Sequence, residues 1–516
     1  MAGTEDGRSI LDGGVSRARF LKLAGLGAGL SLFPGSVFPM SAAGAQAVGG
    51  LEILADAMYP IAAWWPPPPV KDDPGDLRTD QERTNDLYED LATAGFNTVL
   101  GGNGVSSVPA NKLALEACRV NKLRLVLADE RLRNAIDGRA PDTSQEAAQE
   151  EPQSALQALT EQDSPQDLQA QAATEPGAVS QRIQHLYDEF GAHPALAGLL
   201  LYDEPGRKLF GILRDAKAQV EQLSGGEDLP YVNVWPSHAS TRYALQAESY
   251  TDYLEKYMNE SRYQSAVAPP VLSFDHYPLL ADERVTPDFF YNHSVIRNFA
   301  KRFGVPSWGF VQSVGFDGSN GGRGGRRTPD EAESCWQINV ALAYGVNGIQ
   351  YFTYWTPNDP NVEFKNALIT RDGAQTDLYD YAQRANEFLR KVGEILLPLT
   401  SVSVTHFGER RLPRGAKLFR ANNIVKAASW DAAIFGLFGN PDDATERYLL
   451  VVNRSPNKPA TTRLTITGTV GSVDRFDPSV KAPNNPFVTQ PLTGSPRFFT
   501  ASTKPGRAIL YRLRTA

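Results

Sequence analysis

The feature that most constrains this chain is a rhythm between residues 52 and 398. Short apolar runs alternate there with longer amphipathic segments, and the alternation repeats eight times. Apolar runs bounded by turn residues are typical of buried parallel strands, and the amphipathic segments are typical of the helices that cover them. The predicted strands are 57–65, 96–100, 123–128, 197–202, 231–235, 271–274, 308–312 and 348–354.

Eight strand–helix units close most simply into a (β/α)8 TIM barrel, which we predict for residues 52–398. A doubly wound open sheet is the alternative. It is less favoured because no Gly-x-Gly-x-x-Gly turn follows an early strand. The rhythm is interrupted at 139–177 by a segment rich in Gln, Ala, Glu, Ser and Pro, a composition that cannot bury a core. We predict a disordered or loosely helical insertion there, either solvated filler or a lid over the strand ends.

The pattern changes after Pro398. Short apolar runs separated by turn signals replace the helical period, and they predict a small C-terminal all-β sandwich over residues 401–516. The clearest runs are 417–420, 448–453, 463–467 and 507–512.

Residues 1–47 have the outline of an export signal. The basic segment 16–22 precedes an apolar, glycine-rich run at 23–38, and small residues suited to a signal peptidase follow. The segment resembles the twin-arginine type, although Ala18 replaces the second arginine of that pattern. We expect an exported protein without a stable membrane span after processing, because the apolar run is short and broken by Gly and Pro.

Composition excludes several classes of partner. A formal net charge of -8 argues against a nucleic-acid or anionic-membrane surface. The two cysteines, Cys118 and Cys335, fall in separate helical patterns, so we predict buried free thiols and no Cys metal site. No phosphate-binding loop, nucleophile elbow or His cluster with metal spacing is visible, and we expect neither a cofactor nor a metal.

The active site of a barrel is built from the residues at the ends of its strands. The stretch 199–205 is the sharpest example, because an apolar run stops there at Asp203, Glu204 and Pro205. The predicted strand ends carry mainly carboxylates and aromatic rings. They are Trp64, Trp65, Asn103, Asp129, Glu130, Asp203, Glu204, Trp235, His238, Asp275, His276, Tyr277, Gln312, Tyr354 and Trp355.

Carboxylates with aromatic rings suit sugar chemistry. A glycosidic bond needs a protonated carboxyl for the leaving oxygen and a second carboxylate as nucleophile or water base, and aromatic faces stack on pyranose rings. We predict Glu204 as the general acid and Asp275 as its first-choice partner, with Asp203 and Glu130 behind it. Asp203 and Glu204 are expected to point in opposite directions, because successive residues on a strand do so.

These motifs resemble the clan-A glycoside hydrolases, closest to the β-galactosidases of family 42. Asp203-Glu204-Pro205 falls where that family has Asn-Glu-Pro on strand 4, and 275–278 matches its Asp-x-Tyr-Pro on strand 6. The aromatic run 351–355 and the C-terminal sandwich are also similar. The resemblance implies a barrel glycosidase with Glu204 as acid/base and a nucleophilic Glu at the end of strand 7, where this chain has Gln312.

Gln312 cannot form a glycosyl-enzyme ester, so three routes stay open: another carboxylate serves, the substrate supplies its own nucleophile, or the barrel only binds sugar. We therefore predict an exported glycoside hydrolase acting on a carbohydrate substrate. A non-catalytic carbohydrate-binding protein is the alternative, and a polysaccharide lyase ranks lowest. Sugar contacts are expected from one set of residues: Trp64, Trp65, Asn103, Trp235, His276, Tyr277, Gln312, Tyr354 and Trp355.

Overall fold

The computed structural model describes residues 58–70, 76–139, 177–260, 270–317, 325–360, 362–480 and 485–515. The predicted export signal at 1–47 and nearly all of the predicted insertion at 139–177 lie outside these residues. Within the described part of the chain, none of the helices is both long enough and apolar enough to cross a membrane.

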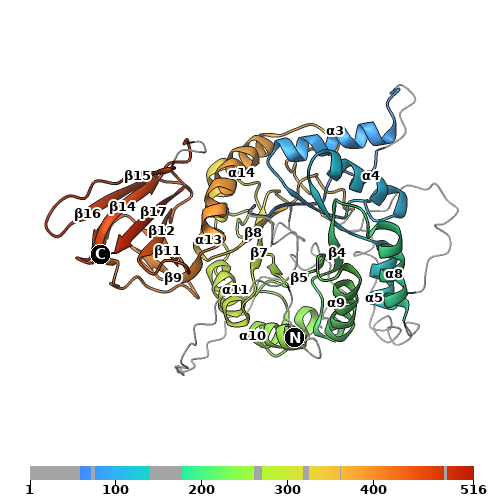
Figure 1. Cartoon of the computed structure of the whole chain (residues 1–516), viewed down its shortest axis with the longest axis horizontal. Helices are drawn as coiled ribbons and strands as arrows, with labels where there is room; N and C mark the ends of the chain where they lie inside the picture. Colours follow the sequence, from blue (N-terminus) through green and yellow to red (C-terminus); the bar gives the residue numbers. More distant parts are fainter. Residues whose placement is uncertain are drawn as a thin grey trace, which may run out of the picture.

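The eight predicted strands form a closed barrel in sequence order, and every neighbouring pair is parallel. This confirms the TIM barrel (Figure 1). The strands are β1 (Ile61–Trp64), β2 (Thr98–Leu100), β3 (Arg124–Leu127), β4 (Leu196–Asp203), β5 (Leu229–Val234), β6 (Leu272–Phe274), β7 (Ser307–Gln312) and β8 (Gly348–Phe352).

Helices surround the barrel, and side chains fix several of their first turns. Thr79 and Asp330 each cap a helix and form a capping box with the Glu three residues on. The principal helices are α3 (Asp80–Thr93), α4 (Val108–Val120), α5 (Glu130–Asp137), α8 (Ala178–Phe190), α9 (Phe210–Ser224), α10 (Tyr250–Glu260), α11 (Phe289–Phe303), α13 (Glu331–Ala343) and α14 (Asp377–Leu396). Helix α5 lies in a stretch for which the sequence pattern predicts no helix.

Two antiparallel sheets form the C-terminal all-β domain and enclose its own apolar core. Their strands are β9 (Thr400–Phe407), β10 (Val425–Trp430), β11 (Ala433–Gly439), β12 (Glu446–Asn453), β13 (Ala460–Ile466), β14 (Val470–Phe476), β15 (Phe487–Thr489), β16 (Phe498–Thr503) and β17 (Ala508–Thr515). The predicted run 448–453 lies in β12, and the runs 463–467 and 507–512 lie in β13 and β17 apart from one residue each. The run 417–420 was wrong as a strand, since only Leu418 makes an isolated bridge, to His406.

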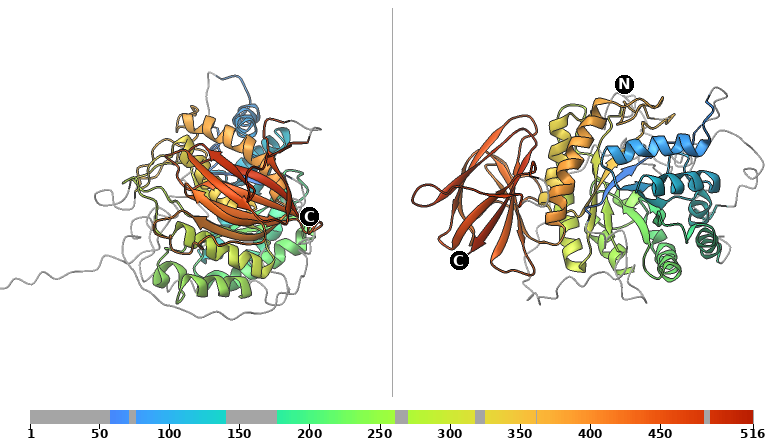
Figure 2. Two further views of the ribbon diagram at one scale, coloured as in Figure 1. Left: turned by 90° about the vertical axis from the view of Figure 1, so that its left-hand side faces the viewer. Right: turned by 45° about the horizontal axis from the view of Figure 1, so that its top comes forward.

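The all-β domain packs against one side of the barrel, along α13 (Figure 2). The Asn339 amide donates to the carbonyl of Gly506 at 2.9 Å. Gly506 has a φ of 66°, and a Cβ there would lie 1.9 Å from the carbonyl oxygen of Ala332, so a glycine is required at this contact. Cys118 and Cys335 are buried free thiols, as predicted.

Candidate active site

The side chains of Asp203 and Asp275 and the main chain of Glu204 meet at Asn233 on β5, a residue for which no role is predicted from the sequence. Its Nδ2 donates to Oδ1 of Asp203 and to Oδ1 of Asp275, both at 3.1 Å. Its main-chain carbonyl accepts the N–H of Glu204 at 2.8 Å. Asn233 has no exposed surface. The ends of β4, β5 and β6 are therefore joined at this side chain.

A chain of hydrogen bonds from inside the barrel orients the Asn233 amide. The Tyr231 hydroxyl donates to Gln350 Oε1 at 2.6 Å, and Gln350 Nε2 donates to Ser273 Oγ at 2.8 Å. Ser273 Oγ then donates to Asn233 Oδ1 at 3.0 Å. Because Oδ1 accepts, both hydrogens of Nδ2 are directed at the two carboxylates. All four residues are buried, so water does not compete for these hydrogen bonds.

Glu204 does not follow the alternation expected of a strand. Its φ is 57°, in the left-handed region, so its side chain need not point away from Asp203. It is 7% exposed, and its charge reaches Tyr253 on α10. Burial first, and several smaller effects that include the Glu204 carboxylate, hold the pKa of Tyr253 well above 10. The Tyr253 hydroxyl keeps its proton and donates to the carbonyl of Pro205 at 2.8 Å.

Asp203 also lies near a cation. Arg133 stacks on the ring of Tyr202, 3.6 Å from its centroid, and its Nε donates to Asp137 at 3.0 Å. Burial alone would lower the pKa of Arg133, but Tyr202, Asp137 and, more weakly, Asp203 raise it overall. The guanidinium of Arg133 thus stays charged.

The carboxylates after β3 are placed differently. Asp129 caps α5 by accepting the N–H of Leu132 at 2.8 Å, and Arg182 Nε donates to its Oδ1 at 2.8 Å. Asp129 therefore joins α5 to α8. Glu130 is the first residue of α5, half-buried, so it follows the strand end through a helix start rather than standing on it.

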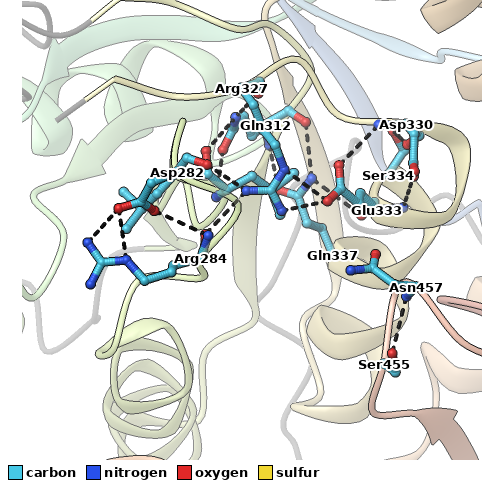
Figure 3. A network of polar contacts seen from close by, with 12 residues as sticks. Asp282, Arg284, Gln312, Arg327, Asp330, Glu333, Ser334, Gln337, Ser455 and Asn457 are labelled. Carbon is cyan, nitrogen blue, oxygen red and sulfur yellow. Dashed lines mark hydrogen bonds and ion pairs between the residues drawn. The ribbon is translucent and has the colours of Figure 1, made fainter. Parts of the chain in front are cut away.

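Gln312, the position of the nucleophile implied by the family resemblance, is bound to main-chain groups (Figure 3). Its Oε1 accepts the N–H of Leu279 at 3.0 Å, and its Nε2 donates to the carbonyls of Leu279 at 3.3 Å and Arg327 at 2.6 Å. The side chain is 1% exposed. It joins the loops after β6 and β7, which is a structural use of the amide that the sequence did not reveal.

The predicted stacking indoles are buried rather than exposed. Trp64, Trp65, Trp235 and Trp355 have at most 8% of their surface accessible. Gly373, in the loop after β8, lies close enough that a Cβ there would be 3.5 Å from the Trp355 ring. The four indoles therefore expose little ring surface, and their role as sugar contacts stays a prediction.

Trp65 has two further unusual properties. Its φ is 65°, a left-handed conformation that is rare for a bulky residue and concentrates at functional sites. Its Nε1–H is buried and has no acceptor among the described residues. Asn103, with a φ of 53°, holds the chain next to Trp65, because its amide donates to the carbonyl of Pro66 at 2.7 Å.

Tyr354 faces away from the barrel mouth, contrary to its predicted role. Its ring packs edge-on against Phe96 at 5.6 Å, and burial and the nearby residues Tyr379, Asp90 and Tyr88 raise its pKa well above 10. It therefore lies under α3 and α14. Tyr277, in contrast, stacks on Phe352 at 4.5 Å, at the end of β8.

His276 belongs to a second group of polar side chains. Its Nε2 lies 2.7 Å from Thr286 Oγ1, and its ring packs on that of His238 with centroids 4.8 Å apart. Burial is the main cause that lowers the pKa of both, that of His238 to about 3, so both imidazoles are neutral at pH 7. Asp288 is close to each of them.

A cavity of about 340 Å³ lies elsewhere, lined by residues from the ends of α8 and α9 such as Tyr187 and Asp228. Those helix ends lead into β4 and β5, so this cavity is at the opposite end of the barrel from the carboxylates. Active sites of TIM barrels lie at the carboxyl ends of the strands, which favours the Asn233 cluster as the site.

Comparison with solved structures finds this fold in a known enzyme. The structure of a catalytic mutant of Gan42B, a GH42 β-galactosidase from G. stearothermophilus, is 9% identical with a TM-score of 0.51, over 89% of this chain and 99% of that chain. The chain shares the fold of that enzyme.

Two other solved structures have lower TM-scores. A β-galactosidase from the psychrophilic Marinomonas ef1 is 11% identical with a TM-score of 0.44, over 66% of this chain and 62% of that chain, so this chain spans less than two thirds of that enzyme. A GH family 44 xyloglucanase from Paenibacillus polymyxa is 11% identical with a TM-score of 0.38, over 89% and 96% of the two chains. No protein-family model matches the chain, and no curated protein matches it at a significant level.

Proposed function

We propose that this protein is a glycoside hydrolase whose general acid is Glu204 and whose second carboxylate is Asp275. The observation that carries the proposal is that Asn233 bonds the carboxylates of Asp203 and Asp275 and the main-chain N–H of the buried Glu204 at the strand ends. Buried carboxylates are costly unless they are paired or used, and glycosidic cleavage needs two of them. The fold shared with a GH42 β-galactosidase supports the same reaction class.

In this reaction Glu204 donates its proton to the leaving glycosidic oxygen. Asp275 either attacks the anomeric carbon or takes a proton from the water that does. Asp203 and Asp275 each have an oxygen 3.1 Å from Asn233 Nδ2, so those two oxygens are at most twice that distance apart. The Nε1–H of Trp65, which has no acceptor among the residues that the structure describes, supports a sugar hydroxyl as its partner.

The test is a pair of variants assayed on 4-nitrophenyl glycosides and on unactivated oligosaccharides. Glu204→Gln is expected to slow the unactivated substrates by about 10²–10⁴-fold, because they need a proton on the leaving oxygen, and the activated ones less. Asp275→Asn is expected to slow both. Glu248→Gln, at an exposed position, is the control. Unchanged hydrolysis in Glu204→Gln would remove the catalytic assignment.

A second candidate is a carbohydrate-binding protein without catalysis. The bonds that hold Gln312 to main-chain groups favour it, because they occupy the position where the resembling family has its nucleophile. Binding of oligosaccharide by calorimetry, with no reducing ends released by the wild type, would support this candidate over the first.

We also propose that the protein is exported by the segment 16–47. The support is the order of the basic, apolar and small-residue segments. Fusion of residues 1–50 to a reporter that is active only outside the cytoplasm tests it, and replacing both Arg17 and Arg19 by Gln is expected to abolish the signal. Reporter activity that survives this change would argue against a twin-arginine route.

A further inference from the structure

Beside the carboxylate site, three metal-ligating side chains converge from separate elements. They are His238 in the loop after β5, His276 at the end of β6, and Asp288 immediately before α11. His238 Nδ1 lies 3.8 Å from one oxygen of Asp288, and His276 Nε2 lies 3.8 Å from the other. All three ligand atoms lie within 4.8 Å of one another.

The ring of His276 is oriented by a contact at Nδ1, the nitrogen that faces away from Asp288. Asn292 Oδ1, an acceptor, lies 3.4 Å from His276 Nδ1 and also accepts the N–H of Ser237. An acceptor there places the hydrogen of the neutral imidazole on Nδ1 and leaves the lone pair of Nε2 toward Thr286 and Asp288. A hydrogen bond from the far ring nitrogen is the arrangement that fixes metal-binding histidines.

The carboxylate of Asp288 is also positioned by a hydrogen bond. The Ser237 hydroxyl donates to its Oδ2 at 3.0 Å. Its side chain makes no capping bond to α11, so the carboxylate is not used to start that helix. The three side chains are 0% to 14% exposed, which shields them from bulk water while leaving an approach past His238 and Asp288.

We propose that His238, His276 and Asp288 bind one divalent transition-metal ion of the zinc class, with a fourth position open to water. Two imidazoles and one carboxylate suit zinc, cobalt, nickel or iron, whereas calcium and magnesium prefer oxygen ligands alone. Zinc ligands lie about 2.0–2.2 Å from the ion, so the side chains must move together by a few tenths of an ångström to about 1 Å. His276 exchanges its contact with Thr286 for the ion.

One nearby charge opposes binding. Arg326 is close enough to lower the pKa of both histidines, although burial is the larger cause. Its Nε donates to the carbonyl of Tyr277 at 2.7 Å, which keeps the guanidinium on the Tyr277 side of the group. The expected affinity is therefore below that of a site with the same ligands and no neighbouring cation.

The proposal is tested with the chelator-stripped full chain and Co²⁺. We expect about one equivalent to bind and to give visible absorption bands of four- or five-coordinate cobalt. Asp288→Asn keeps the size of the side chain and loses no helix cap, and His238→Ala removes a ligand at the edge. Each is expected to weaken binding at least about 10-fold, the loss that even an outer partner causes. His185→Ala, at an exposed position on α8, is the control.

Two outcomes of the cobalt titration would contradict the metal site. Absorption of the octahedral aqueous type, or equal binding by wild type, Asp288→Asn and His238→Ala, would overturn the site. Near-ultraviolet circular dichroism checks that each variant is folded. Metal content is read without any sugar assay, and Glu204→Gln is expected to bind Co²⁺ like the wild type. Failure of the metal site is therefore distinguishable from failure of the proposed hydrolase activity.

Discussion

The amide nitrogen of Asn233 lies 3.1 Å from Oδ1 of Asp275, and its other hydrogen is donated to Asp203. Because Ser273 fixes the opposite end of the amide, Asn233 cannot turn to present its oxygen to the carboxylates. One buried side chain thus sets the positions of two of the candidate catalytic groups, and its replacement tests that geometry directly.

Asn233→Asp is expected to lower the stability of the protein more than Asn233→Ala does at neutral pH. The aspartate puts acceptor oxygens against Asp203 and Asp275, whereas alanine only leaves them without a donor, at a cost of about 1–3 kcal/mol. The difference in stability between the two variants is expected to shrink as pH falls. Protonating the new aspartate, Asp203 or Asp275 removes the repulsion among the three carboxylates. Thermal unfolding from pH 4 to 8 measures it.

Asn386→Asp is the matched control for this change. Asn386 is also fully buried, and it donates to the carbonyl of Ala94 at 2.9 Å, but it lies on α14, away from the three carboxylates. Asn233→Asp is also expected to shift the pH profile of hydrolysis, because it adds a carboxyl beside Asp203 and Asp275, whereas Asn386→Asp is expected to lose stability yet leave that profile unchanged. If both aspartate variants moved the profile equally, Asn233 would have no special role at the site.

Gln312→Glu is expected to destabilise the protein and not to create a nucleophile. The new carboxylate would face the carbonyls of Leu279 and Arg327, which Nε2 now satisfies. Loss of this donor is expected to cost about 1–3 kcal/mol or more. Denaturant midpoints measure the loss, with Gln222→Glu at an exposed position as control. A gain in hydrolysis would mean that the side chain can leave its main-chain partners.

Asp129→Ala is expected to lower stability by about 3–5 kcal/mol, because it leaves Arg182 buried without its partner and removes the cap of α5. The Asp129 side chain is 1% exposed and that of Arg182 is 13% exposed, so water does not replace the bond. Glu116→Ala breaks the exposed pair with Arg119 and is expected to cost at most about 1 kcal/mol. Equal losses in the two variants by urea unfolding would contradict this account.

The eight barrel strands were predictable because each is a local apolar run, and the rule for strand ends predicted that Asp203 and Asp275 lie near each other, although their catalytic roles stay predictions. Other parts of the site depend on the backbone conformation and on contacts between residues far apart in the sequence. The left-handed turn at Glu204 breaks the alternation on which its direction was judged. An asparagine inside a buried strand is a signal that its amide must be bonded, but it does not say to which groups. The partners of Gln312 depend on where two loops run.

His293 on α11 gives the sharpest pH prediction for stability. Its ring lies between those of Phe289 and Phe274, at 4.7 and 5.2 Å, and its Nδ1 has no hydrogen-bond partner among the described residues. Burial, and secondarily His276, lowers its pKa from 6.5 to about 3. In the unfolded chain it is protonated below pH 6.5. Between pH 6.5 and 3 the unfolded state therefore binds the extra proton, and stability falls as pH falls.

The contribution of His293 at pH 5 is about 2 kcal/mol of destabilisation relative to pH 7, at roughly 1.4 kcal/mol per pH unit. His293→Phe keeps an aromatic ring in the pocket and removes the titrating group. The variant is expected to lose about that much less stability than the wild type between pH 7 and 5, measured by urea unfolding at each pH. His185→Phe, exposed on α8, is expected to leave the pH dependence unchanged. A wild-type slope retained in His293→Phe would show that other groups cause the acid sensitivity.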